Sequence, residues 1–178
     1  MEFFLPNLIQ NLIHLMLAGI RDWGSLHPVI IHFPVVLLLI APFFLLFGLV
    51  FSQSAKTCFS VFLILLWLGT GTLFLAVFTG EVASEAITAP APDIVSTLDS
   101  HLQLAEKSRM IFSVFTITGT CYMLVLKKRL NKKINRIVFV LSLFGYAYGL
   151  IILINAAHQG GRLVHHHGIH SKLYAQTP

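Results

Sequence analysis

Histidines are the side chains in this sequence whose number and spacing best suit chemistry, because imidazole ligates metals and moves protons near neutral pH. The chain has 178 residues and nine of them are histidine. Two lie close together in the sequence LHPVIIHFP, as His27 and His32. Five residues at about 100° each place their rings roughly 140° apart around a helix. We therefore expect His27 and His32 to serve two different sites, or one site and one structural hydrogen bond, rather than to chelate one ion.

The remaining candidates lie before the third apolar run of the chain and after its last one. His101 precedes the third run, and His158 follows the fourth, just before the double glycine Gly160-Gly161. This double glycine predicts the end of a helix and a chain that folds back. The tail then reads RLVHHHGIH, in which His165, His166 and His170 are typical of an adventitious metal-binding tract. For each of these histidines, a helix cap or a solvated surface residue is the plainer alternative.

Composition indicates the elements that must position these histidines. The chain is 56% hydrophobic and 11% charged, whereas soluble domains carry about 25% charged residues. A helix needs about 20 apolar residues to cross a bilayer. Four apolar runs free of Asp, Glu, Lys and Arg cover residues 29–51, 58–78, 110–126 and 137–157. The sequence therefore predicts an all-α integral membrane protein, with a four-helix bundle over 24–170.

The two ends of the chain fall outside this predicted bundle. Residues 1–20 place Leu5, Leu8 and Leu12 on one side of a helix and Asn7 and Asn11 on the other. Such an amphipathic pattern favours an interfacial helix lying on the membrane, with a fifth span as the alternative. Residues 171–178 form a short polar tail.

Basic residues predict how the bundle is oriented. The segment 127–136 reads KKRLNKKINR, with six positive side chains, and the loop between the first two runs holds Lys56. Positive loops face the cytoplasm, so the histidines and the C-terminus should face the periplasm of a bacterial inner membrane. The net charge of +5 comes from this clustering, which indicates topology rather than nucleic-acid binding.

Known motifs exclude several classes of function. Cys58 and Cys121 form no CxxC or CxxCH, so neither a disulfide scaffold nor a covalently attached c-type haem is expected. The chain has no GxSxG, P-loop or GxGxxG motif for hydrolysis or nucleotide binding. Small residues such as Gly69, Gly145 and Gly149 predict close helix packing, or alternatively room for a flat cofactor between helices.

The two ends of the predicted bundle resemble a family of bacterial multi-pass membrane proteins that carry the domain of unknown function 2231. The pattern is an LHP-x-x-x-HFP opening, a histidine before the third helix and a GG-x-LV-x-x-HG ending. Residues 24–170 carry this resemblance, although the specific motifs occupy only the two ends. The histidines that match the pattern are His27, His32, His101 and His167. His158 is not part of the pattern.

The resemblance implies a haem-b-binding electron-transfer subunit similar to other four-helix membrane cytochromes. Its four histidines would ligate the iron of one or two haems as bis-histidine pairs. One arrangement pairs His32 with His101 and His27 with His167, and His158 could replace any of them. Such a subunit would exchange electrons with quinol or a periplasmic cytochrome. It would also contact the lipid bilayer and other subunits of an oxidoreductase complex.

Two other functions compete with this interpretation. Histidine clusters also suit a non-haem copper or zinc site at the outer face. Alternatively, the protein is a structural or assembly subunit whose histidines cap helices and donate hydrogen bonds. Absorbance in the Soret region distinguishes the haem protein from both.

Overall fold

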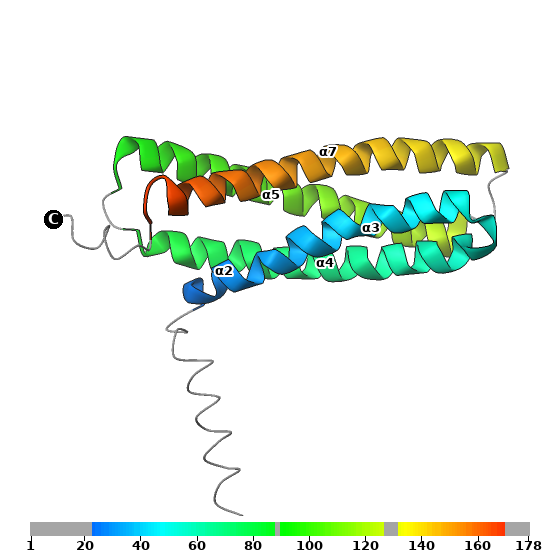
Figure 1. The fold of residues 1–178 in the computed structure, drawn as a ribbon, viewed down its shortest axis with the longest axis horizontal. Helices are drawn as coiled ribbons and strands as arrows, with labels where there is room; N and C mark the ends of the chain where they lie inside the picture. The colour runs from blue at the N-terminus through cyan, green and yellow to red at the C-terminus, as the bar shows by residue number, and fades with distance from the viewer. Residues whose placement is uncertain (1–22, 88–89, 127–131, 170–178) are drawn as a thin grey trace, which may run out of the picture.

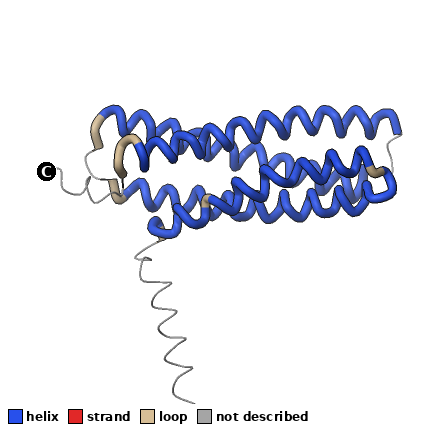
Figure 2. Tube along the Cα trace, in the orientation of Figure 1, coloured by secondary structure: helices blue, strands red, loops and turns tan. Residues whose placement is uncertain are grey.

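The computed structural model describes residues 23–87, 90–126 and 132–169. The interfacial helix expected over 1–20, the tail 171–178 and residues 127–131 of the basic segment lie outside these residues. Within them the chain is almost entirely helical and has no strand (Figure 2). The prediction of an all-α membrane bundle is confirmed.

Two helical hairpins make up the fold (Figure 1). The first hairpin contains the turn η1 (Gly24–Leu26), α2 (His27–Ile30), α3 (His32–Val50), the turn η2 (Ser52–Ser54) and α4 (Ala55–Glu85). The second contains α5 (Pro92–Cys121), the π-helical turn η3 (Tyr122–Leu126) and α7 (Lys132–His165). Contacts of α4 with α5 and of α3 with α7 join the hairpins into a four-helix bundle.

Three stretches of helix are long and apolar enough to cross a membrane, namely Gly24–Gly48, Ala55–Glu85 and Ile137–His165. The fourth helix, α5, is apolar only after Arg109, so the expected third span is the C-terminal part of a longer helix. Large apolar side chains face outward from the bundle, among them Phe43, Phe74, Leu141 and Phe144. Such an exposed apolar surface is typical of a protein whose solvent is lipid.

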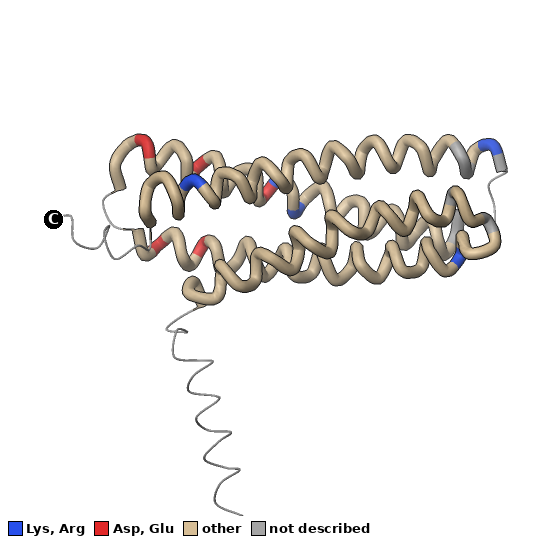
Figure 3. The backbone as a smooth tube through the Cα atoms, in the orientation of Figure 1, with Lys and Arg blue, Asp and Glu red and all other residues tan. Residues whose placement is uncertain are grey.

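Acidic residues lie toward one end of the bundle, whereas basic residues lie at both ends (Figure 3). Basic Lys56 and Lys133 lie at the end where α4 and α7 begin, and acidic Glu85 and Asp93 lie at the opposite end together with Arg162. The acidic end also holds every histidine that the structure describes, which are His27, His32, His101, His158, His165, His166 and His167. The expectation that these histidines gather at one end of the bundle is confirmed for the described residues.

Tyr146 of α7 occupies the centre of the core. Its ring packs against Phe62 of α4 and against Phe112 and Phe115 of α5, with centroids 5.3–5.7 Å apart. Its hydroxyl donates a 2.7 Å hydrogen bond to the carbonyl oxygen of Leu38 in α3. In a regular helix this carbonyl would accept from the residue four positions later, but that residue is Pro42, which has no N–H. The tyrosine hydroxyl therefore satisfies a carbonyl that the proline leaves without its helical partner.

This arrangement predicts a coupled pair of substitutions. Tyr146→Phe should lower the free energy of unfolding by about 1–2 kcal/mol, because it leaves the Leu38 carbonyl unpaired in an apolar core. In a Pro42→Ala background, where a backbone N–H is restored, the same change should cost less than half as much. Unfolding in mixed detergent micelles measures both values. Equal costs in the two backgrounds would show that the hydroxyl does not act through this carbonyl.

Candidate functional site

His27 is held inside the bundle at the start of α2. Pro28 occupies the first helical turn, where the missing N–H has no helical partner in any case. The Nδ1 atom of His27 lies 2.9 Å from the carbonyl oxygen of Ala76 in α4 and 3.3 Å from Thr79 Oγ1. Thr79 donates its own proton to the Leu75 carbonyl. Since both neighbours of Nδ1 act as acceptors, this nitrogen carries the ring proton.

His101 of α5 makes the same kind of hydrogen bond in the second hairpin. Its side chain is buried, with the residue 8% exposed. Nδ1 lies 2.8 Å from the carbonyl oxygen of Ala156 in α7. A carbonyl only accepts hydrogen bonds, so Nδ1 is again the protonated nitrogen. In both rings Nε2 is then the nitrogen that carries the lone pair in the neutral form.

A glycine lies under each ring, four residues after the alanine whose carbonyl accepts from it. A Cβ atom added at Gly80 would lie 2.9 Å from His27 Cε1, and one added at Gly160 would lie 3.0 Å from His101 Cε1. Both distances are at or below the limit of real contacts, so only glycine leaves the rings where they are. The two hairpins therefore hold their histidines with the same device, an Ala-x-x-x-Gly segment on the neighbouring helix.

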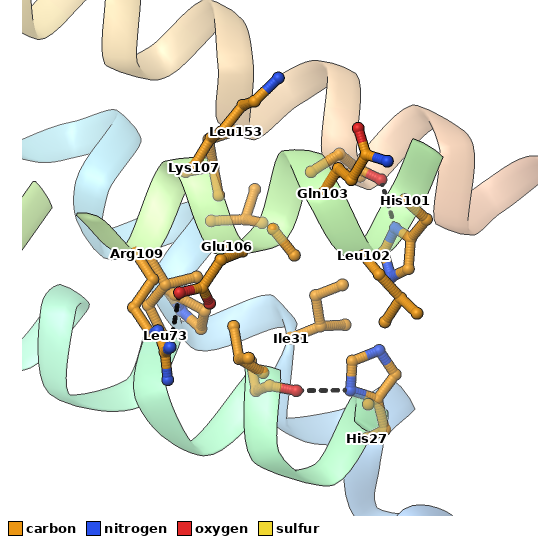
Figure 4. A pocket seen from close by; sticks show the side chains of 18 of the residues that line it. His27, Ile31, Leu73, His101, Leu102, Gln103, Glu106, Lys107, Arg109 and Leu153 are labelled. Carbon is orange, nitrogen blue, oxygen red and sulfur yellow. Dashed lines mark hydrogen bonds and ion pairs between the residues drawn. The ribbon is translucent and has the colours of Figure 1, made fainter. Parts of the chain in front are cut away.

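The two rings face each other across the bundle. Figure 4 shows the second nitrogen of each ring turned toward the other ring. Their centroids are 6.3 Å apart and their planes are inclined by 77°. A metal–imidazole bond is about 2 Å long, so a separation of this order suits one ion held between the two Nε2 atoms. A hydrogen bond from Nδ1 to a carbonyl is the usual way in which a protein orients a ligating histidine.

Two cavities meet at this pair of histidines. The larger has a volume of about 560 Å³ and extends inward along all four helices. The smaller, of about 300 Å³, extends toward the acidic end of the bundle. His27, Gly80 and His101 line both cavities. The space on either side of the histidine pair is therefore open and largely apolar.

The family to which this chain is similar covers both hairpins. Residues 24–173 match the family model described as a predicted membrane protein, DUF2231. The chain belongs to this family. No curated protein and no solved structure matches the chain. The DUF2231 match includes the histidine pair and both glycines beneath it, and it assigns no activity, so the argument for function rests on the geometry.

The structure places the other candidate histidines away from this pair. His32 is exposed on the outer surface of α3, and His158 is exposed on α7 beside Arg162 and His165. His167 is buried, but its Nδ1 lies 3.3 Å from Asp93 Oδ2 and its Nε2 lies 3.3 Å from Thr97 Oγ1. The rings that lie next to each other in the structure are those of His27 and His101, whereas the sequence suggested His32 with His101 and His27 with His167.

The double glycine does not end the last helix, so this expectation is wrong. α7 continues through Gly160 and Gly161 to His165. The chain instead folds back at Gly168, whose φ of 67° favours glycine. The Ile169 N–H donates to the Leu163 carbonyl at 3.1 Å, which closes the turn. Gly160 therefore lies within the helix. The ring of His101 fills the space that a side chain at this position would need.

Among the residues that the structure describes, no group of three or more His, Cys, Asp and Glu side chains could hold a metal ion. A tetrahedral zinc or copper site draws three or four ligands from the protein. Cys58 is half-buried and Cys121 is exposed, and neither lines the two cavities at the histidine pair. This part of the chain therefore offers a pair of ligands rather than a cage.

Sequence reasoning overlooked two features of the site. The first is the pair of glycines under the rings, whose signal was the Ala-x-x-x-Gly spacing shared by Ala76 and Ala156. The second is an ion pair in the larger cavity, in which Arg109 Nη2 donates to Glu106 Oε1 at 2.6 Å. Its signal was a pair of opposite charges three residues apart, just before an apolar run.

Proposed function

We propose that this DUF2231 protein binds one haem b between His27 and His101 and transfers electrons within the membrane. The observation that carries the proposal is the histidine pair itself. Two imidazoles from different hairpins have their Nδ1 atoms held by backbone carbonyls, and their Nε2 atoms turned toward a common centre. This is the donor set of a bis-histidine b-type cytochrome.

The cavities support the same ligand. A flat macrocycle with its iron between the two rings needs space on both sides of the axis that joins them. Cavities of about 560 and 300 Å³ adjoin this axis on opposite sides, and together they fall within the range of cofactor sites. Apolar residues such as Ile31, Leu73 and Leu163 line them.

Haem would supply a one-electron redox centre, and the protein would tune it. Two histidine ligands would favour electron transfer over chemistry on a bound substrate. His27 and His101 would hold the iron, and the Ala76 and Ala156 carbonyls would orient their rings and raise their basicity. The apolar walls would exclude water and so help to set the reduction potential.

The location that suits this function is a bacterial inner membrane. Lys56 and Lys133 at one end of the bundle favour a cytoplasmic position for that end. The histidine end would then face the periplasm, where a soluble cytochrome or another subunit of an oxidoreductase complex could accept or supply electrons.

A reduced-minus-oxidised spectrum with a pyridine haemochrome assay tests the proposal. Protein purified in detergent should contain a b-type haem, and titration of the haem-free protein with haemin should saturate at about one equivalent per chain, because the described residues offer one facing pair. A well-folded protein without a Soret band, and without saturable haemin binding, would contradict the proposal.

A structural role is the second candidate, and the same hydrogen bonds favour it. The bond from His27 to Ala76 ties α2 to α4, and the bond from His101 to Ala156 ties α5 to α7. If this were the whole role of the histidines, their replacement would lower stability while the wild-type protein showed no chromophore. The spectrum of the wild-type protein therefore separates the two candidates before any variant is made.

A further inference from the structure

An ion pair lies at the side of the bundle, beside a membrane-spanning helix and at the point where the apolar part of α5 begins. The Arg109 guanidinium sits over the ring of Phe74, 5.1 Å from its centroid, and donates to Glu106. Phe74 belongs to α4, which spans Ala55–Glu85, and lies about 6 Å along the axis from the centre of that helix. Ionisable side chains beside a membrane-spanning helix are costly and are usually functional.

This ion pair lies in the same cavity as the histidines (Figure 4). Glu106 and Arg109 are five and eight residues after His101 on α5, about 8–12 Å along the helix. The walls between the two groups are apolar, with Pro34, Leu73 and Leu153 among them.

The ion-pair end of the cavity is open to the side of the bundle. The side chain of Glu106 is 42% exposed and that of Arg109 is 32% exposed. Phe74, over which the guanidinium lies, is 47% exposed. These residues come from α4 and α5, so this end of the cavity opens between the two helices at the side of the bundle, beside exposed apolar side chains such as Phe74.

We propose that the end of this cavity at Glu106 and Arg109 binds the head group of a lipid-soluble quinone. A ligand that enters from the bilayer must be largely apolar, and the pair offers it one donor and one acceptor. The guanidinium donates to a quinone carbonyl oxygen, and the carboxylate accepts from a quinol hydroxyl. The inference deepens the proposed function and rests on it, because a haem between His27 and His101 is the redox partner within reach of this site.

Binding of a short-chain benzoquinone to the haem-loaded protein in detergent, measured by calorimetry, tests the inference. Glu106→Gln and Arg109→Gln should each weaken binding about 10- to 100-fold, as expected for the loss of a charge-assisted hydrogen bond. Lys107→Gln is the matched control, because Lys107 lines the same cavity but its side chain points away from the pair (Figure 4). This control should change the Kd less than about twofold. An azido derivative of the quinone should label α4 or α5 beside the pair.

The haem content of the same samples separates failure of this inference from failure of the proposed function. Haem-loaded protein that lacks saturable quinone binding, or that binds quinone equally well in the Gln variants, would overturn the quinone site alone. A Gln variant that loses haem while quinone affinity per folded chain is unchanged would also overturn it, and would assign the pair to the haem. Arg109→Lys keeps the charge, and it should retain part of the affinity if Arg109→Gln does not fold.

Discussion

Replacement of His27 or His101 by alanine is expected to remove haem almost completely. Loss of a group that merely orients a metal ligand costs about 10- to 100-fold in affinity, and loss of the ligand itself should cost more. In the wild-type protein the two ring centroids are 6.3 Å apart. Each substitution would leave one imidazole of this pair to hold the haem. Haem per folded chain, determined by the pyridine haemochrome assay after size-exclusion chromatography, measures the effect.

The other histidines supply matched controls for this prediction. His32→Ala and His158→Ala alter exposed side chains, and His167→Ala alters a side chain bound to Asp93 and Thr97. All three variants should retain haem at the wild-type ratio. Added imidazole should restore binding to His27→Ala and His101→Ala by filling the space that each substitution leaves. A variant of His32 or His167 that loses haem as completely as His101→Ala would contradict the assigned pair.

Valine at Gly80 or Gly160 is expected to disable the site without touching a ligand. A Cβ atom at either position would meet the Cε1 atom of a histidine ring at 2.9–3.0 Å, so the ring must rotate away from its carbonyl and from the facing ring. Because the expected loss comes from misorientation, haem affinity should fall about 10- to 100-fold. Titration of the haem-free variants with haemin measures the affinity.

Glycines on the same two helices control for the general effect of valine in a helix. Gly71 in α4 and Gly161 in α7 have nothing within 4 Å of an added Cβ atom. Gly71→Val and Gly161→Val should therefore bind haem like the wild-type protein. Any effect of valine on helix stability is shared by all four variants, so it does not explain a difference in haem affinity. If Gly80→Val bound haem as tightly as Gly71→Val, the rings would not depend on the glycines beneath them.

The two hairpins use one solution twice, and this repetition strengthens the assignment of the site. His27 and His101 differ in position along their helices, because one begins α2 and the other lies in the third turn of α5. Each nevertheless donates from Nδ1 to an alanine carbonyl and packs on the glycine one turn later. A histidine that only capped a helix end would need neither the glycine nor a facing ring.

The sequence by itself determined the class of protein and the end of the bundle at which the described histidines gather. Whether a run can cross a membrane depends on its length and polarity, which are local properties. The sequence therefore predicted membrane-spanning helices at 29–51, 58–78 and 137–157. The 140° offset between His27 and His32 also follows from helix geometry alone. It indicated that the two rings do not share one site, and in the structure His27 lines the two cavities while His32 is exposed.

Only the tertiary structure decided which histidines face each other. The pairing depends on how far each hairpin slides along the other and on how α5 is rotated, and no single helix carries that information. The same holds for Gly160, which looked like a helix end because glycine commonly stops helices. Here it lies within the helix, and the ring of His101 from the neighbouring helix α5 occupies the space that a side chain would need. The Tyr146 hydroxyl likewise meets the carbonyl freed by Pro42 only after residues 108 positions apart are packed together.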